Sequence, residues 1–386
     1  MSTLSDGGET APCPNYGYPS QVIVYLDAIA ANLRSIRSVV RQDLSLMAVV
    51  KANAYGHGAR EVARVAIRNG ADLLAVANIE EALELRQAGI DAPILTLSYV
   101  PAAAIKCAID LDVSVTVYDC EQARQYQSAA ADGVGTLTAH IKVDSGMGRL
   151  GVLPGDVDEL CRYVSEQPAI ELEGIFTHFS SADTDSQYTA GQLSRFADIV
   201  TGLERKGFQF QYVHAANSAA LLAQPSSHFN LVRPGLLLYG LNPLGDGEGP
   251  DWLQPAMTWK TTIAQVKTLP SGSAVGYGNS YRTQGREKIA VLPVGYADGL
   301  RRAPRTWREV LLRGQRAPLV GRVSMEKTAI NVSHIPGAQA GDEVVLLGKQ
   351  GDDEISADEI AAWLGSINYE VVTSIAPRAP RAFVQV

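Results

Sequence analysis

The chain has 386 residues, of which 46% are hydrophobic and 19% are charged, so it can bury a sizeable core and is not expected to be disordered. Its formal net charge of -8 argues against a nucleic acid or an anionic membrane surface as the main partner. The cysteines form no Cys-x-x-Cys pair and no Cys/His cluster, which argues against a metal site and suits a reducing compartment. They are Cys13, Cys107, Cys120 and Cys161.

Residues 1–19 are rich in Gly, Pro, Ser and Thr and are predicted to form a loose N-terminal tail. This segment has neither a basic start nor an apolar run, so it does not resemble a signal peptide. No apolar stretch approaches the ~20 residues that span a bilayer, and we expect a cytoplasmic protein without a membrane partner. Residues 21–26 form a predicted strand, and Asp27 is placed to cap a helix that runs to Arg37.

Beyond this helix, eight short apolar runs alternate with connections of helix length. The runs cover residues 44–50, 73–77, 94–97, 113–117, 137–143, 172–177, 212–215 and 230–232. Helical patterns lie between most of them, for example at residues 60–69, 80–88 and 187–206. Eight such units within about 200 residues predict a (β/α)8 barrel rather than an open doubly wound sheet.

After about residue 255 the pattern changes to short strands between Gly- and Pro-bearing turns. The strand candidates include residues 263–269, 288–293, 309–312 and 343–347, and one helix is predicted at 356–363, with Ser356 placed to cap it. The chain is therefore predicted to fold as a barrel domain at 20–255 and a mainly β domain at 256–386, and the strand at 21–26 is free to join the second domain instead.

Polar side chains follow five of the eight predicted barrel strands, at the end of the barrel where active sites lie. They are Lys51 and Tyr55 after the first, Arg149 after the fifth, His178 after the sixth, Asn217 and Ser218 after the seventh, and Arg233 with Gly235 after the eighth. A lysine at the mouth of a barrel is partly desolvated, which favours its neutral and nucleophilic form. The last two strand ends are also typical of a phosphate-binding site. The alternative interpretation is a solvated lysine, an ordinary helix cap and an ordinary turn.

Nine stretches, all in the same order, resemble the alanine racemase family over roughly residues 21 to 380. The most specific is Val50-Lys51-Ala-Asn-Ala-Tyr55-Gly-His-Gly58, which is similar to the pyridoxal-phosphate attachment segment of that family. The others are His140-Ile-Lys142-Val-Asp-Ser-Gly-Met-Gly-Arg149-Leu-Gly, Thr177-His178-Phe179, Asn217-Ser218, Val232-Arg233-Pro-Gly235, Gly276-Tyr277-Gly278, Gly295-Tyr296-Ala-Asp-Gly299, Gly321-Arg-Val-Ser-Met325 and Ile367-Asn-Tyr369-Glu.

The resemblance implies a racemase that interconverts L- and D-alanine with pyridoxal 5'-phosphate held as a Schiff base on Lys51. It also implies a homodimer, in which Tyr277 of the other subunit is the second base. Two opposed acid/base groups are needed because a proton returned from the side it left regenerates the starting enantiomer. Since the pKa of tyrosine is near ~10, Tyr277 must lie among cationic groups, and His178 is implied as its neighbour.

The resemblance implies further roles for residues of the site. Arg233 would face the pyridine nitrogen, where a guanidinium that keeps its proton would suppress transamination. The cofactor would also be held by Tyr55, Arg149, His178, Asn217, Ser218, Gly235, Leu236 and Tyr369. Arg149 and the backbone amide of Met325 would bind the substrate carboxylate. Tyr296 and Arg302 would line the substrate entrance, and Lys142 matches a lysine that is carbamylated in some members.

Two departures from the family pattern concern substrate preference and the loop before Tyr277. The chain has Met325-Glu326-Lys327 where the family usually has Met-Asp-Gln, and Gly276 where many members have Ser. A racemase of serine or of broader specificity on the same plan therefore remains an alternative.

Three other functions compete with racemisation. A non-catalytic pyridoxal-phosphate carrier would share the barrel and its lysine but would lack the second domain with Tyr277. A decarboxylase of this type would place a cysteine in the second domain, and no cysteine lies beyond Cys161. Gly146-Met-Gly148-Arg-Leu-Gly151, with Glu171 and Glu173 about twenty residues on, also matches the weak dinucleotide motif of a dehydrogenase.

Overall fold

The computed structural model describes residues 17–131, 135–245 and 249–385, so Cys13 and most of the predicted tail lie outside the described residues. The chain divides into two compact units. Of the described residues, one unit comprises 24–131, 135–245, 249–257, 357–374 and 383–385, and the other comprises 17–23, 258–356 and 375–382. We call them the barrel unit and the sheet unit.

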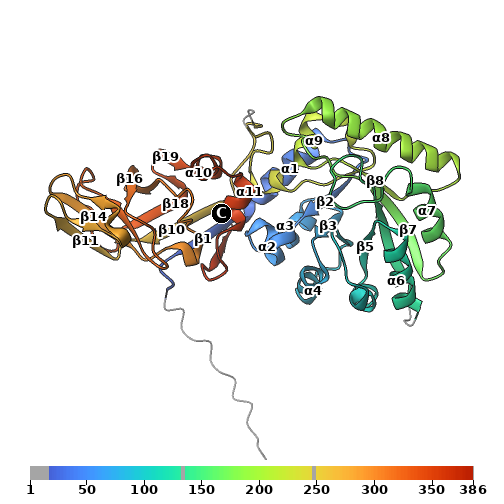
Figure 1. Cartoon of the computed structure of the whole chain (residues 1–386), viewed down its shortest axis with the longest axis horizontal. Coiled ribbons are helices and arrows are strands. Elements are labelled where there is room, and N and C mark those ends of the chain that lie inside the picture. The colour runs from blue at the N-terminus through green and yellow to red at the C-terminus, as the bar shows by residue number, and fades with distance from the viewer. Residues whose placement is uncertain (1–16, 132–134, 246–248, 386) are drawn as a thin grey trace, which may run out of the picture. The chain divides into compact units, whose positions relative to one another are not determined.

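The barrel unit is built on eight parallel strands that close into a barrel (Figure 1). In order they are β2 (Ser45–Val49), β3 (Leu73–Val76), β4 (Ile94–Thr96), β5 (Val113–Val117), β6 (Leu137–Lys142), β7 (Ile170–Phe176), β8 (Tyr212–His214) and β9 (Leu231–Val232). The barrel closes where Ser45 and Leu46 of β2 pair with Leu231 and Val232 of β9. Strands covered on both faces are apolar along their whole length, as all four buried residues of β3 are. The predicted (β/α)8 barrel is therefore confirmed.

Helices connect the barrel strands and lie outside them (Figure 1). They are α1 (Leu26–Val39), α2 (Lys51–Tyr55), α3 (Ala59–Arg68), α4 (Ile79–Gln87), α5 (Ile105–Asp110), α6 (Cys120–Ala131), α7 (Val157–Ser165), α8 (Ser186–Arg205) and α9 (Ser218–Ala223). Two more helices, α10 (Ala357–Leu364) and α11 (Asn368–Thr373), also belong to the barrel unit. The prediction that Asp27 caps α1 was wrong: Tyr25 is the N-cap, and Asp27 lies in the first turn, where its charge favours the helix dipole. Within the described ranges, no helix is both long and apolar enough to cross a membrane.

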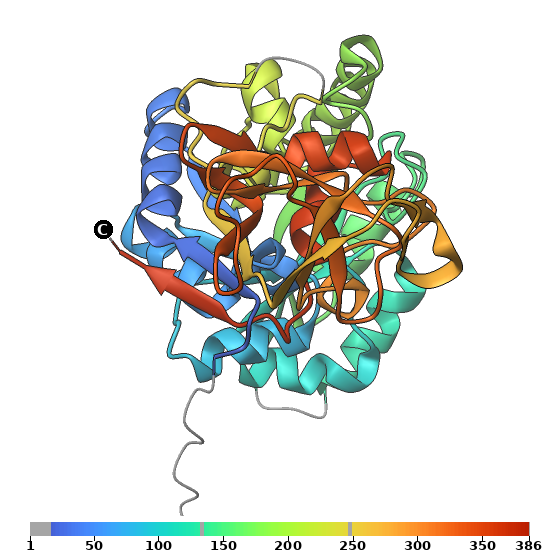
Figure 2. The same ribbon diagram turned by 90° about the vertical axis from the view of Figure 1, so that its left-hand side faces the viewer.

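The sheet unit is mainly β, as predicted. Its ten-stranded sheet has the order β11-β14-β17-β16-β15-β18-β10-β1-β20, with β19 paired to β18. The bounds are β1 (Gln21–Tyr25), β10 (Met257–Thr262), β11 (Gln265–Leu269), β14 (Glu287–Leu292), β15 (Glu309–Leu312), β16 (Gln315–Val320), β17 (Thr328–Asn331), β18 (Glu343–Gln350), β19 (Asp353–Ile355) and β20 (Arg381–Val384). A separate hairpin pairs β12 (Ala274–Val275) with β13 (Tyr281–Arg282). The two strands from opposite ends of the described chain, β1 and β20, lie side by side (Figure 2).

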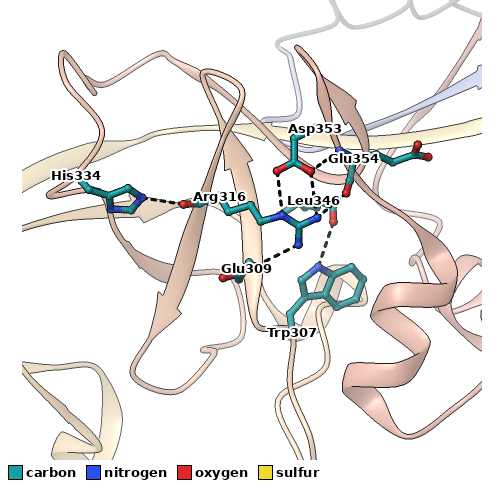
Figure 3. A network of polar contacts seen from close by, with 7 residues as sticks. All are labelled: Trp307, Glu309, Arg316, His334, Leu346, Asp353 and Glu354. Atoms are coloured by element: carbon teal, nitrogen blue, oxygen red, sulfur yellow. Dashed lines mark hydrogen bonds and ion pairs between the residues drawn. The ribbon is translucent and has the colours of Figure 1, made fainter.

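A polar cluster fixes one part of this sheet (Figure 3). The guanidinium of Arg316 on β16 binds both carboxylate oxygens of Asp353 on β19, at 2.9 and 3.1 Å, and lies 3.3 Å from Glu309 on β15. The indole nitrogen of Trp307 donates to the carbonyl of Leu346 on β18 at 3.1 Å. The Arg316 contacts thus join β15, β16 and β19, and Trp307, two residues before β15, bonds to β18.

Candidate active site

Lys51 lies two residues beyond the end of β2, at the C-terminal end of the barrel strands, and opens an unusual turn. The four residues after it, Ala52 to Tyr55, have φ between 52° and 53°, which is the left-handed region. Such a conformation costs roughly 1–3 kcal/mol per residue and persists only when the surroundings fix it. Contacts with the surrounding structure must therefore hold the backbone of this turn in its strained conformation.

Glu81 at the start of α4 is one of the groups that hold this turn. Its carboxylate accepts from the backbone N–H of Ala52 at 2.7 Å and from that of Ala77, just after β3, at 2.7 Å. One side chain thus ties the ends of two neighbouring barrel strands. Sequence analysis missed this role, although a Glu three residues after the helix cap Asn78 is a position from which a side chain can reach back over the N-terminus.

Aromatic side chains pack beneath the Lys51 turn. The ring of Tyr55 lies 4.9 Å from that of Tyr239 and 6.0 Å from that of Tyr369 on α11, measured between centroids. Tyr239 donates its hydroxyl to the carbonyl of Val49 at the end of β2 at 2.8 Å. Burial raises the pKa of the Tyr55 hydroxyl and raises that of Tyr369 to about 12, so both stay protonated donors near neutral pH.

The ends of β8 and β9 meet through Ser218. Its hydroxyl oxygen accepts from the backbone N–H of Gly235 at 2.8 Å, and Leu237 N–H lies at 3.4 Å. Asn217 caps α9 by accepting from the N–H of Ala220. A Cβ at position 235 would lie 2.8 Å from the Tyr55 hydroxyl, so only glycine leaves room beside that donor. Ser218, Gly235 and Tyr55 are therefore brought together, as the phosphate-site prediction requires.

Arg233, which follows β9, is almost completely buried and held by three neutral acceptors. Its guanidinium donates to the carbonyls of Thr177 and Ala215 at 2.8 and 2.9 Å and to Nδ1 of His214 at 2.8 Å. It also lies 3.5 Å from Nδ1 of His178 and over the ring of Phe176. These contacts fix the direction in which the guanidinium points.

The barrel residues form a strongly cationic group. Burial lowers the pKa of Lys51, and the charges of Arg149 and Arg233 lower it further, whereas Glu81 opposes them. Burial and the same two arginines lower the pKa of Lys142 to about 8. Burial and the surrounding cations also hold the pKa of His178 well below its ordinary value, so its ring is neutral near pH 7. A lysine in this setting is a neutral base or nucleophile much more often than an exposed lysine is.

The loop that carries Arg149 is organised by Asp144 rather than by a bound dinucleotide. The Asp144 carboxylate accepts from four successive backbone N–H groups, those of residues 146 to 149, at 2.8 to 3.1 Å. These amides are therefore directed at a side chain and not at a pyrophosphate. The Gly146-x-Gly148-x-x-Gly151 motif is part of the Arg149 loop in a closed barrel, which argues against a dehydrogenase.

Leu236 is buried in the barrel unit, whereas Tyr277, Tyr296, Arg302 and Met325 lie in the sheet unit. Tyr277 is 67% exposed and Met325 57%. The backbone N–H of Tyr296 donates to the carbonyl of Ser324, and that of Ala297 donates to the carbonyl of Met325. The guanidinium of Arg302 donates to the carbonyl of Val323 in the same loop. The structure thus groups Tyr296, Arg302 and Met325 within this unit.

The departure at Glu326 has a local structural partner. Its carboxylate forms an ion pair with Arg378 at 3.1 Å. Arg378 also donates to the Tyr18 hydroxyl at 2.6 Å and lies 3.2 Å from the buried Asp298. The longer side chain of Glu326 therefore anchors the Met325 loop to the chain segment around Arg378.

The barrel residues fit pyridoxal 5'-phosphate by their chemistry. The cofactor carries an anionic phosphate and an anionic phenolic oxygen, and cations and hydroxyl donors surround Lys51 and Gly235. Its pyridine nitrogen can accept a hydrogen bond, and Arg233 is a fixed donor of the kind that could provide one. Because residue 235 is glycine, no Cβ occupies the space beside the Tyr55 hydroxyl.

Comparison with known proteins agrees with this chemistry. The family model described as alanine racemase, N-terminal domain, matches residues 24–243, and that described as alanine racemase, C-terminal domain, matches residues 256–383. The chain belongs to the alanine racemase family. Members of this family depend on pyridoxal 5'-phosphate, and the predicted resemblance and cofactor are confirmed.

Individual relatives are similar over nearly their full length. Alanine racemase 2 of Caldanaerobacter subterraneus subsp. tengcongensis is 43% identical over 368 residues, which are 95% of each chain. The alanine racemase of Desulfovibrio desulfuricans is 42% identical over 96% of this chain and 100% of its own. Among solved structures, the Bacillus anthracis alanine racemase with bound L-Ala-P has a TM-score of 0.91 at 40% identity, covering 96% of both chains. The chain is thus similar in fold and sequence to amino-acid racemases throughout.

Proposed function

We propose that this chain interconverts L- and D-alanine by a two-base mechanism, with Lys51 as one base and Tyr277 of a second copy as the other. The observation that carries the proposal is the position of Lys51, which is held on a fixed left-handed turn at the end of β2, with its pKa lowered by burial, Arg149 and Arg233. Pyridoxal 5'-phosphate, attached through Lys51, supplies the electron-withdrawing group that makes the α-proton of the bound amino acid acidic.

Residues of the barrel unit bind and orient the reactants. Tyr55, Ser218 and the Gly235–Leu236 backbone would hold the phosphate, and Tyr369, His178 and Asn217 would complete this cofactor-binding set. Arg149 binds the substrate carboxylate together with the backbone N–H of Met325. Arg233 would donate to the pyridine nitrogen and keep its own proton, which would limit charge delocalisation into the ring and disfavour transamination.

Proton movement is divided between two atoms on opposite faces of the α-carbon. The neutral Nζ of Lys51 takes the proton from one enantiomer, and the Tyr277 hydroxyl returns a proton from the other face. In the reverse direction the roles exchange, because both groups must then be in the opposite protonation state. Burial and the nearby cations lower the pKa of Lys51, which favours its neutral form, and a cationic setting is also what Tyr277 requires.

A homodimer with composite sites accounts for the exposure of Tyr277. A base that is 67% exposed in a single chain cannot exclude water from the reaction. Covering by a second copy supplies that exclusion and brings Tyr277 to the partner's Lys51. We further propose that the enzyme is cytoplasmic, which the free thiols of Cys107, Cys120 and Cys161 support, and that it supplies D-alanine for biosynthesis.

The decisive experiment incubates purified protein with a panel of L-amino acids in deuterated water. The proposal predicts deuterium at Cα and formation of the D-enantiomer, with alanine turned over fastest. If serine were turned over faster than alanine, serine would be the preferred substrate. Deuterium exchange without inversion would contradict the two-base mechanism. Protein that binds the cofactor but exchanges no α-proton would be a carrier.

A further inference from the structure

A carboxylate inside the barrel is linked to Arg233 through two histidines. Nε2 of His140 on β6 lies 2.7 Å from Oε2 of Glu173 on β7, and Nδ1 of His140 lies 2.9 Å from Nε2 of His214 on β8. Nδ1 of His214 in turn lies 2.8 Å from the guanidinium of Arg233. Both imidazoles are completely buried, and the Glu173 side chain is 20% exposed. A continuous hydrogen-bonded chain therefore runs from β7 to the proposed cofactor site.

An irregularity in the barrel accompanies this chain. In the pairing of β6 with β7, Ala139 is opposite Leu172 but His140 is opposite Gly174, so Glu173 is an extra residue on β7. An extra residue of this kind is a β-bulge, which redirects a side chain relative to the regular alternation of a strand. The bulge brings the Glu173 carboxylate to His140, and Ser114 on β5 donates to the same oxygen at 3.1 Å.

Space for the His140 ring depends on Gly174, the residue that follows Glu173 on β7. A Cβ at Gly174 would lie 2.5 Å from His140 Nδ1, closer than real contacts allow. The ring of His214 stacks on Phe176 of the same strand, with centroids 4.7 Å apart and an interplanar angle of 4°. Strand β7 thus supplies the acceptor, the space and the stacking surface for the two histidines.

The chemistry of Arg233 fixes the direction of every hydrogen bond in the chain. A guanidinium only donates, so His214 Nδ1 must be an acceptor and its proton must lie on Nε2. His140 Nδ1 then has to accept from His214, which puts the His140 proton on Nε2, where it is donated to Glu173. Each imidazole is neutral and held in one tautomer, and the carboxylate at the far end is the only group in the chain that accepts without donating.

The charges at the two ends balance each other across the neutral rings. Burial and the nearby Arg233 keep the pKa of His214 well below its ordinary value, which agrees with a neutral ring. Burial alone would raise the pKa of Glu173, but hydrogen bonds from His140 and Ser114 hold it below its ordinary value, so the group is a carboxylate near neutral pH. A buried guanidinium held by neutral acceptors is stabilised by a negative charge at the end of a polarised chain.

We infer that Glu173 is a positioning residue of this enzyme, which acts through His140 and His214 to give Arg233 a fixed acceptor and hence a fixed orientation. Without an acceptor at Glu173, the His140 proton can move to Nδ1. The His214 proton then moves to Nδ1 as well, where it opposes the Arg233 donor. Only the last step, from Arg233 to the cofactor, rests on the proposed function.

The tautomers can be measured by solid-state NMR of the cofactor-loaded chain, labelled with ¹⁵N in its histidine rings. We expect both His140 and His214 to carry one proton, on Nε2, with an unprotonated Nδ1. Glu173→Gln, which keeps an oxygen acceptor, should retain these tautomers. Glu173→Leu should shift the His214 proton toward Nδ1, change the visible spectrum of the bound cofactor, and lower kcat by about 10-fold or more with little change in KM.

The matched control is Glu171→Leu, an exposed carboxylate on the same strand, which should change none of these quantities. A proton on Nδ1 of either ring in the unsubstituted chain would overturn the inference. So would a Glu173→Leu chain that keeps the tautomers, the spectrum and kcat. If Glu173→Leu does not fold, the unsubstituted chain and Glu173→Gln still decide the tautomers. A chain with the expected tautomers but no racemase activity would contradict the proposed function and leave the histidine chain in place.

Discussion

The two units of the molecule prepare their proposed site residues in opposite ways. In the barrel unit, Arg233 and Ser218 are each 3% exposed and bonded to neighbouring strand ends. In the sheet unit, Tyr277 and Met325 are 67% and 57% exposed. The barrel residues are therefore positioned by the fold of one chain, whereas the sheet residues would be desolvated only by the second copy of the proposed dimer. The difference implies that cofactor binding and racemisation can be separated by mutation.

The largest effect is expected from Lys51→Ala. This substitution removes both the attachment amine and one base, so the visible absorbance of lysine-bound pyridoxal 5'-phosphate should disappear. Racemisation should fall by about 10⁴-fold or more in both directions. Absorption spectra and alanine racemisation rates measure these outcomes. A coloured, active Lys51→Ala chain would remove Lys51 from the mechanism.

Tyr277→Phe should strongly reduce racemisation without affecting cofactor binding. Because the barrel residues hold the cofactor, its absorbance should stay, while racemisation should fall by about 10² to 10⁴-fold with the loss of one acid/base group. Tyr281→Phe, a nearby tyrosine bonded to Glu287, is the matched control and should racemise normally. Normal racemisation by Tyr277→Phe would contradict the two-base assignment.

Mixing the two defective chains tests whether a site combines two copies. In a 1:1 mixture of Lys51→Ala and Tyr277→Phe subunits that reassort freely, half of the dimers are mixed and each has one intact site. About one quarter of the normal activity should therefore return. If activity stays absent although native mass spectrometry detects mixed dimers, Lys51 and Tyr277 belong to the same copy.

Sequence predicted most reliably what depends on local pattern. Parallel strands buried on both faces appear as continuous apolar runs, so β3 and the other barrel strands were found, and the strand-end rule placed Lys51 and Arg233 at one end of the barrel. The two-residue strands β12 and β13 are too short to carry a periodic pattern. The orientation of Glu173 depends on the register between β6 and β7, which no single segment specifies.

The roles of individual site residues depended more on resemblance than on pattern. Nothing in the spacing of Tyr277 distinguishes a base from an exposed loop tyrosine. Residues that hold the site indirectly were missed, because their function lies in contacts between distant segments. Glu81, which binds the N–H of Ala52, is one such residue, and Asp144, which binds the Arg149 loop, is another.

A smaller and pH-dependent effect is expected at Lys142 in the barrel unit. Its pKa, lowered to about 8 by burial and neighbouring cations, leaves about half of the amine neutral at pH 8 and roughly a hundredth at pH 6. Carbamylation requires the neutral amine, so ¹³C-bicarbonate should produce a carbamate resonance at pH 8 that weakens steeply toward pH 6. Lys142→Arg is the control that should lack this resonance. A resonance of equal strength at both pH values would show that the lowered pKa does not govern the modification.

The smallest effect is expected at the polar cluster of Figure 3, which lies in the sheet unit. A substitution there should change the stability of the sheet unit and leave the chemistry of the barrel unit unchanged. Asp353→Asn removes one charge from the pair with Arg316, whose side chain is 32% exposed, so solvent screens much of the interaction. The melting temperature should fall by about 1–2 °C while cofactor absorbance and racemisation stay unchanged. The exposed neighbour Asp352 provides the control Asp352→Asn, which should shift the melting temperature less. Loss of racemisation in Asp353→Asn at an unchanged melting temperature would mean that this cluster, far in sequence from Lys51, acts on the reaction rather than on the sheet alone.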